Sequence, residues 1–231
     1  MRNKTLHRLR FSSTVYGAAA GLFGLAALGL TACSSSVKPN YYTLAPRVVP
    51  TAQPTLRVIE LLPVNLPDRL DRASLMINSE QGQAKILDND RWTSNLAVEL
   101  HDSLSAGLQQ QLGAVDRYSS GMPNGKIAYR IATDFSRFDT IQSASNPNNN
   151  RVEVEVSWTI KPIIANPVNA SNVARPLSCR MTFNQAIASP FKIPDTVNAS
   201  RSALNRVITS ISNTVIASEK GTTQVPAAIC G

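Results

Sequence analysis

Hydrophobic and polar positions alternate strictly over residues 151–164, which predicts a long strand with one buried and one solvated face. The preceding segment 126–139 predicts a partner strand. Between them, the polar stretch 140–150 predicts an antiparallel hairpin with a long mobile loop. The expected inward residues of the second strand are Val152, Val154, Val156, Trp158 and Ile160.

Further segments also have the character of strands. The β-branched run 56–62 ends at Pro63 and predicts a buried strand. Short strands are expected over 73–78 and 84–87. Later in the chain, inward alternation predicts a third long strand, with buried residues Leu177, Cys179, Met181, Phe183 and Ile187.

Helical periodicity appears first over residues 91–112. The N-cap residues Asp88, Asn89 and Asp90 predict its start, and Gly113 predicts its end. A step of four residues exceeds the 3.6-residue period, so the apolar stripe slants by about 40° per step. We expect the helix to cross a twisted sheet obliquely or to give one end to a partner subunit. The stripe consists of Trp92, Leu96, Leu100, Leu104, Leu108 and Leu112.

A last helix is expected to begin at Pro194-Asp195-Thr196 and to lie flat on the sheet. Together these segments predict a single α/β domain of the α+β type. It is a mainly antiparallel twisted sheet with two amphipathic helices packed on it. The inward residues of the last helix are Leu204, Val207, Ile208, Ile211 and Val215.

The N-terminus has the features of a bacterial export signal. Residues 1–10 are basic, and the apolar run 15–30 is too short and too rich in Gly and Ala for a permanent membrane span. The run ends in Leu30-Thr31-Ala32-Cys33, which matches the lipobox. We therefore expect a signal peptide over 1–32 and acylation of Cys33. The alternative is an uncleaved anchor helix with an incidental cysteine.

The signal sets the layout of the rest of the chain. We expect a lipidated cysteine and linker over 33–54, one domain over 55–217 and a tail over 218–231 that the pattern does not place. Only Ser34 to Asn40 separate Cys33 from the first apolar motif, a tether of about 25 Å at full extension. Ser34 follows the cysteine where enteric lipoproteins retained at the inner membrane have Asp. The outer membrane is therefore the expected destination.

The net charge of +8 does not indicate nucleic-acid binding. Four of the basic residues lie in the export signal, and the remainder are spread along the chain without a Lys/Arg run. We expect the membrane to be met through the lipid anchor and no nucleic acid to be bound.

Catalytic and metal-binding patterns are missing from the sequence. His101 is the single histidine after the signal, and it has no nucleophile motif or metal-spaced partner. Glu153 and Glu155 share a strand face with Arg151, which favours a solvated charged row over acid/base chemistry. We expect no enzyme activity, no catalytic residues, no metal and no cofactor.

Two cysteines, Cys179 and Cys230, remain in an oxidising compartment and form no Cys-x-x-Cys motif. A disulfide between them would pin the C-terminal tail. Cys179 is also compatible with a free thiol on the inward face of its strand. The sequence leaves both alternatives open.

Several short motifs together resemble a known family. They are Tyr41-Tyr42-Thr43-Leu44 after the cysteine, the segment Leu66-Pro67-Asp68-Arg69-Leu70-Asp71-Arg72, and Arg91-Trp92. Their order and spacing resemble the PqiC-type ABC-type transport auxiliary lipoproteins. The Asn-rich loop, the segment 162–175 and the Cys-bearing tail depart from that pattern.

The resemblance implies an outer-membrane lipoprotein with acyl chains such as palmitate, facing the periplasm. It implies a docking or auxiliary subunit of an intermembrane lipid transport system, with a PqiB-like, periplasm-spanning MCE-domain protein as partner. It also implies a homo-oligomeric ring, in which the slanted helix or the wet hairpin face meets a neighbour. The competing interpretations are an envelope-integrity adaptor that contacts cell-wall or outer-membrane assembly machinery, and a hydrolase that uses His101.

The motif residues have physical interpretations of their own. We expect Pro67, Leu70 and Arg72 to shape a turn with an exposed basic contact, and Trp92 to pack the start of the helix. Tyr41 and Tyr42 either wedge into the body near the anchor or cover the edge of the sheet. Leu44 completes that first motif.

Overall fold

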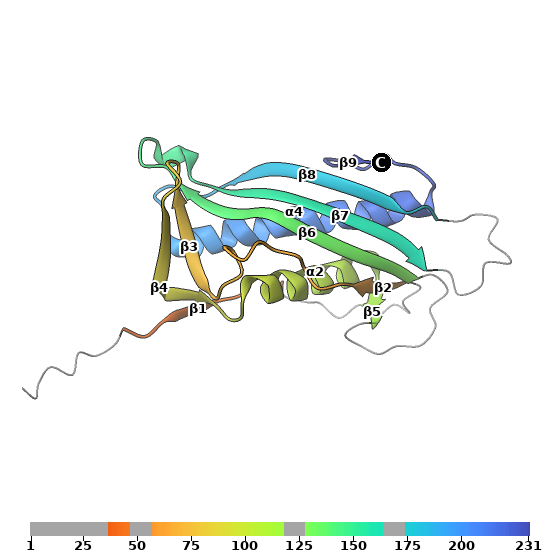
Figure 1. The fold of residues 1–231 in the computed structure, drawn as a ribbon, viewed down its shortest axis with the longest axis horizontal. Helices are drawn as coiled ribbons and strands as arrows, with labels where there is room; N and C mark the ends of the chain where they lie inside the picture. The colour runs from red at the N-terminus through yellow and green to blue at the C-terminus, as the bar shows by residue number, and fades with distance from the viewer. Residues whose placement is uncertain (1–36, 47–56, 118–127, 164–173) are drawn as a thin grey trace, which may run out of the picture. The chain divides into compact units, whose positions relative to one another are not determined.

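Three long strands, β6 (Ala128–Gln142), β7 (Arg151–Ile163) and β8 (Leu177–Ala186), form the centre of the sheet in the computed structural model (Figure 1). They are adjacent and antiparallel, so the predicted hairpin and third strand are confirmed. All five expected inward residues of β7 are buried. One face of these strands is therefore core and the other is polar.

The structure describes residues 37–46, 57–117, 128–163 and 174–231. Residues 39–231 form one compact unit. The expected signal peptide, Cys33, and part of the 33–54 linker lie outside the described residues.

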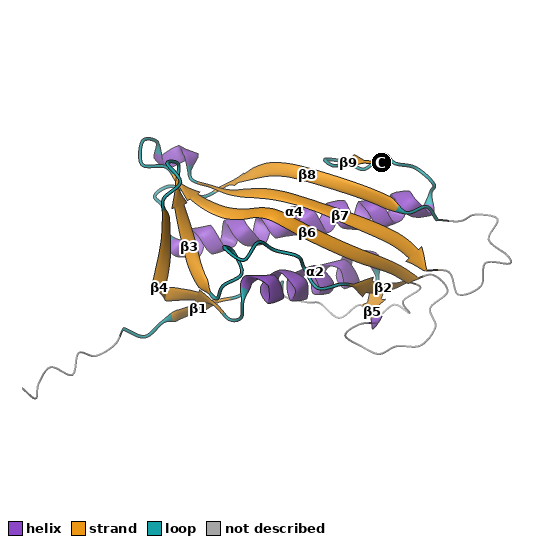
Figure 2. Cartoon of the chain, in the orientation of Figure 1, coloured by secondary structure: helices purple, strands orange, loops and turns teal. Residues whose placement is uncertain are grey.

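Shorter strands extend the sheet on both sides and make it mixed (Figure 2). The order is β1-β4-β3-β6-β7-β8-β9, and β2 pairs with both β5 and β6. Four pairs of strands are parallel: β3 with β6, β1 with β4, β2 with β5 and β2 with β6. Antiparallel pairing thus holds for the long strands, and the short strands add parallel pairs. The short strands are β1 (Asn40–Tyr42), β2 (Arg57–Leu61), β3 (Ser74–Ser79), β4 (Ala84–Trp92), β5 (Ala114–Asp116) and β9 (Ile229–Cys230).

Two helices, α2 (Leu96–Leu112) and α4 (Ile193–Glu219), lie on the same face of the sheet (Figure 1). The α+β fold with two packed amphipathic helices is therefore confirmed. Trp158 of β7 donates a hydrogen bond from its indole to Thr214 Oγ1 of α4 at 3.0 Å. Gly113 ends α2 in the left-handed conformation that was expected of it.

The predicted start of the first helix is wrong by five residues. Asp88, Asn89 and Asp90 lie inside β4, which runs on to Trp92 because it pairs with β3 and then with β1. The amide of Trp92 donates to the carbonyl of Ala73 at 2.6 Å. Asn95 is the N-cap instead. Sheet pairing therefore decides between two clusters of equally good capping residues.

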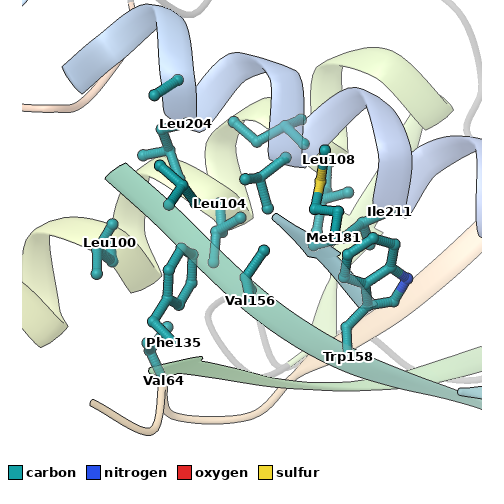
Figure 3. Close-up of a cluster of buried hydrophobic side chains, with 14 of the residues drawn as sticks. Val64, Leu100, Leu104, Leu108, Phe135, Val156, Trp158, Met181, Leu204 and Ile211 are labelled. Atoms are coloured by element: carbon teal, nitrogen blue, oxygen red, sulfur yellow. The ribbon is translucent and has the colours of Figure 1, made fainter. Parts of the chain in front are cut away.

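The leucine stripe of α2 is buried within this chain, as Figure 3 shows for three of its members. Leu100, Leu104 and Leu108 have no exposed surface, and the end residues Leu96 and Leu112 are 5% and 4% exposed. They pack against Phe135, Val156 and residues of α4 such as Leu204 in one core. Both ends of the leucine stripe are therefore buried within this chain.

Gly107 lets α2 and α4 approach closely. A Cβ atom at this position would lie 2.6 Å from Ile208 Cδ1 of α4, closer than two carbon atoms pack. Any side chain at this position therefore requires Ile208 to shift.

Arg57 ties the C-terminal ends of the two helices together. Its Nη1 donates to the carbonyl of Leu112 at 3.0 Å, and its Nε and Nη2 donate to the carboxylate of Glu219 at 2.8 and 3.0 Å. Neither helix has a basic residue of its own in its last turn. A side chain from β2 thus supplies the positive charge that favours a helix C-terminus.

The loop of the long hairpin is shorter than predicted. β6 continues to Gln142, and a 3-10 helix over Pro147–Asn149 fills the connection. Asn150 accepts a hydrogen bond from the amide of Ser143 at 3.0 Å and donates to the carbonyl of Pro147 at 2.7 Å. The Asn-rich sequence is therefore used for hydrogen bonds inside the loop.

The C-terminal tail, which the pattern does not place, adds a strand to the edge of the sheet. β9 pairs with β8 so that Cys179 lies opposite Cys230, and the two form a disulfide. Of the two alternatives for these cysteines, the structure contains the bridge.

No helix in the described residues is long and apolar enough to cross a membrane.

Candidate functional site

The segment nearest the expected lipid anchor is attached to the body along β1. Asn40, Tyr41 and Tyr42 pair in parallel with the last residues of β4, and the amide of Thr93 donates to the carbonyl of Tyr42 at 2.9 Å. The Tyr42 hydroxyl donates to Asp90 at 3.2 Å. The first motif of the mature sequence is therefore part of the fold.

A buried carboxylate, Glu99, holds the next two residues. Its Oε2 accepts from the hydroxyl of Thr43 at 2.9 Å and from the amide of Leu44 at 2.8 Å. Its Oε1 accepts from the hydroxyls of Thr93 and Ser94, the latter at 3.2 Å. We call Glu99 and its four partners the clasp. Four donors converge on one side chain that is 4% exposed.

The pKa of Glu99 follows from this environment. Burial disfavours the charged carboxylate and by itself raises the pKa. The hydrogen bonds from Thr93, Leu44, Thr43 and Ser94 together outweigh burial, so the pKa of Glu99 lies below its ordinary value. The clasp therefore contains a carboxylate that is charged at neutral pH.

A second element secures the same segment. Arg201 of α4 donates from Nε to the carbonyl of Thr43 at 2.9 Å, and Leu44 is 2% exposed in the core between the helices. The segment is thus held by α2 through Glu99 and by α4 through Arg201. Both helices define where the chain enters the body.

The two tyrosines of the first motif have different positions. Tyr42 is half-buried and packs against the core, whereas Tyr41 is 60% exposed. Tyr42 therefore covers the core next to Trp92, its partner in β4. Trp92 is 6% exposed and ends β4 instead of starting α2.

The second motif forms a turn between β2 and β3. The carbonyl of Pro67 accepts from the amides of Leu70 at 2.8 Å and Asp71 at 3.3 Å, and Leu70 is buried. Asp71 accepts from the amide of Ala97 at 3.1 Å and so caps α2, whose own N-cap residue makes no side-chain bond. Arg72 is half-buried, its Nε donates to the carbonyl of Arg69 at 3.0 Å, and its side chain lines an open hollow; the expected basic contact at Arg72 stays a prediction.

Charged side chains line a hollow of about 800 Å³ on the face of the sheet that the helices leave uncovered. The guanidinium of Arg69 donates to the carboxylate of Asp139 at 2.6 and 3.2 Å. The same carboxylate accepts from the side-chain amide of Asn78 at 2.9 Å. Farther along, Glu153 accepts from Arg137 at 3.1 Å and from Arg151 at 2.7 Å. The predicted charged row is therefore present as a network of ion pairs.

His101 lies in α2 away from these groups. Its Nδ1 is 3.2 Å from Asp102 and its Nε2 is 3.5 Å from the carbonyl of Leu61. Among the described residues, no group of three His, Cys, Asp or Glu side chains is placed to hold a metal ion.

Sequence reasoning assigned no role to Glu99, Asp71 or Thr43, whose side chains hold the motifs in place. No signal in the sequence marks Glu99, because the expected helix starts at residue 91 and does not place Glu99 in its first turn. Its partners in residues 43 and 44 are far away in sequence, and no local pattern pairs them. Glu99 and Arg201 hold and orient the segment at residues 43 and 44. The face of the sheet opposite the two helices is open and polar.

These features define a body fixed at the residues that follow a lipid attachment motif. A family model described as the ABC-type transport auxiliary lipoprotein component matches residues 42–212. The chain belongs to this family. It is therefore a membrane-anchored envelope lipoprotein associated with transport.

Solved structures share the fold at low sequence identity. Protein XCC0632 from Xanthomonas campestris, assigned to the family DUF330, is 18% identical with a TM-score of 0.56, over 79% of this chain and 98% of that one. A crystal structure of an uncharacterised protein is 17% identical with a TM-score of 0.52, over 76% of this chain and 97% of that one. A comparison with curated proteins gives no match.

Proposed function

We propose that this chain is an outer-membrane lipoprotein, acylated at Cys33, that faces the periplasm and serves as a docking subunit of an MCE-domain intermembrane lipid transport system. The observation that carries the proposal is the clasp. Glu99 and Arg201 hold the backbone at Thr43 and Leu44, so the body is fixed close to its anchor. A docking subunit needs such a fixed orientation to present one surface to a partner from the opposite membrane.

The docking surface is the uncovered face of the sheet. The opposite face is filled by α2 and α4, and the leucine stripe of α2 is buried in the core of its own chain. The uncovered face carries the Arg137, Arg151 and Glu153 network beside the hollow. A periplasm-spanning, PqiB-like MCE protein meets this face, and copies of the lipoprotein surround its end as a homo-oligomeric ring.

The role is structural and requires no catalysis, metal or cofactor. The contacts of His101 are with Asp102 and with a backbone carbonyl, which supports a place in the helix packing. Activity of the transport system should therefore survive His101→Ala. Loss of transport with a stably folded variant would support the hydrolase alternative.

Membrane fractionation tests the anchor. The native lipoprotein should appear in the outer-membrane fraction, and Cys33→Ala should remove it from that fraction. Ser34→Asp should move it to the inner membrane in an enteric host, because Asp at this position is the retention signal there. Recovery of the native protein in the inner membrane would contradict the proposed location.

Crosslinking in intact cells, followed by purification of the lipoprotein, tests the partner. The expected adduct is an MCE-domain protein, together with adducts between copies of the lipoprotein. Adducts only to cell-wall or outer-membrane assembly proteins would overturn the docking role. They would identify the protein as an envelope-integrity adaptor.

A further inference from the structure

Exposed apolar side chains are few in the described residues, and one pair lies on the strands nearest the anchor. Five large hydrophobic side chains are exposed among all the described residues: Val37, Tyr41, Ile86, Val98 and Ile229. Tyr41 belongs to β1 and Ile86 to β4, which pair with each other, whereas Ile229 lies on β9 at the other edge of the sheet. Tyr41 is 60% exposed and Ile86 is 47% exposed, so much of the surface of each side chain is not used in packing.

Both side chains point away from the core that the helices cover. Tyr41 alternates with Tyr42, which packs against that core, so Tyr41 projects to the other side of the sheet. Ile86 lines the same hollow as Arg137 and Glu153, on the uncovered face. Arg91, the partner of Tyr41 in β4, is also exposed. The register of β4 shifts between Ile86 and Arg91, so that Arg91 pairs with Ser74 and Ile86 with Met76, two residues apart on the same face of β3.

The length of the tether limits how far this region lies from the lipid. Eight residue steps join Cys33 to Tyr41, a span of at most about 28 Å. β1 is fixed to the body by its pairing with β4 and by the clasp that follows it. Flexibility elsewhere in the body therefore cannot lengthen this span. Contact with the bilayer is then an intramolecular event with a high effective concentration.

The chemistry of the three side chains suits a bilayer surface. Tyrosine is enriched at the membrane–water interface, where its ring meets the acyl region and its hydroxyl meets water. Arginine reaches lipid phosphates while its methylene groups cover apolar surface. We propose that Tyr41, Ile86 and Arg91 form a patch that rests in the headgroup region of the membrane holding the lipid on Cys33. This inference rests on the lipid anchor of the proposed function, and it assigns the β1–β4 edge of the uncovered face to the membrane and leaves the central strands with Arg137 and Glu153 to the docking partner.

Tryptophan fluorescence of the lipidated full-length chain tests the patch. The variants Tyr41→Trp, Ile86→Trp and, as the matched control, Ile229→Trp are reconstituted in vesicles of phosphatidylethanolamine and phosphatidylglycerol with brominated acyl chains. Trp92 and Trp158 are 6% and 2% exposed and give a common background in all three variants. Ile229 is as exposed as Tyr41 but lies on the opposite edge of the sheet.

We expect quenching of the added tryptophan at positions 41 and 86 to be several-fold stronger than at position 229. Equal quenching at the three positions, with the Cys33 lipid verified by mass spectrometry, would overturn the patch and leave the anchor intact. Absence of lipid on Cys33 of the protein purified from membranes would overturn both the patch and the proposed anchor. Capture of the MCE partner is read separately and does not affect this result.

Discussion

Glu99 and Leu44 are 55 residues apart in sequence, and the carboxylate of Glu99 accepts a hydrogen bond from the amide of Leu44 at 2.8 Å. This bond joins the start of α2 to the segment that leads from the expected lipid anchor. Thr43, Thr93 and Ser94 complete the set of donors. Glu99 therefore accepts two of the hydrogen bonds that attach the tether segment to the body, beside those from Arg201 and the β1–β4 pairing.

Removing that side chain should destabilise the fold and release the segment. Glu99→Ala leaves the amide of Leu44 and three hydroxyls without their acceptor. We expect the free energy of unfolding to fall by about 3 kcal/mol. Denaturant titration measures this change. Limited proteolysis of the native state should show new cleavage within residues 37–46.

Glu155→Ala is the matched control for this change. Glu155 is an exposed carboxylate, paired with Arg137 at 3.6 Å, and its loss should change stability by less than about 0.5 kcal/mol. If Glu99→Ala were no more destabilising than Glu155→Ala, the clasp would not hold the segment.

The lowered pKa of Glu99 makes part of the stability depend on pH. A carboxyl group whose pKa is lower in the folded state than in the unfolded chain stabilises the fold above its unfolded value, here near 4.5. That contribution is lost as pH falls through the folded pKa. We expect Tm to fall less steeply in Glu99→Gln than in the native protein between about pH 6 and pH 3. Parallel curves for the two proteins would contradict this assignment.

The disulfide between Cys179 and Cys230 should account for a large part of the stability. It closes a loop with a sequence separation of 51, for which chain entropy predicts a stabilisation of about 4 kcal/mol. Cys230→Ser should show this loss under oxidising conditions and should match the native protein once both are reduced. Two alkylatable thiols in the native oxidised protein would contradict the bridge.

The close approach of the helices at Gly107 predicts a specific steric effect. Gly107→Leu places side-chain atoms where Ile208 now lies, and we expect it to destabilise the protein by about 2 kcal/mol. Adding Ile208→Ala to the same chain removes the clash and should restore part of the loss. The comparison of the two unfolding midpoints checks this. A larger loss in the double variant than in Gly107→Leu would contradict the packing.

The sequence predicts the elements whose burial follows a clear period. The inward residues of β7 and β8 and those of α4 lie where alternation and helical spacing place them. The start of α2 does not lie where it was predicted. Asp88 to Asp90 are residue types that suit an N-cap just as much as Thr93 to Asn95. Only the pairing of β4 with β3 and β1 distinguishes these two clusters.

The short strands and the clasp depend on contacts between distant segments. β1, β5 and β9 have two or three residues each, too few for a period to be recognised. The partners that hold the motif residues have no signal in the sequence. The hydroxyl of Thr43 is held by the carboxylate of Glu99. The turn at Leu70 is joined to α2 by the hydrogen bond from the amide of Ala97 to Asp71. Such pairs become visible only once the chain is folded.

The most direct test of the account is site-specific photocrosslinking in cells that make the full lipid-anchored chain. The photoreactive residue replaces Glu155 on the uncovered face of the sheet or Asp102 on α2, both exposed charged positions. The account predicts adducts to an MCE-domain protein from position 155 and none from position 102. Adducts to that protein from position 102 alone would place docking on the helical side. Adducts from neither position, with the lipoprotein abundant in the membrane, would contradict docking on the uncovered face.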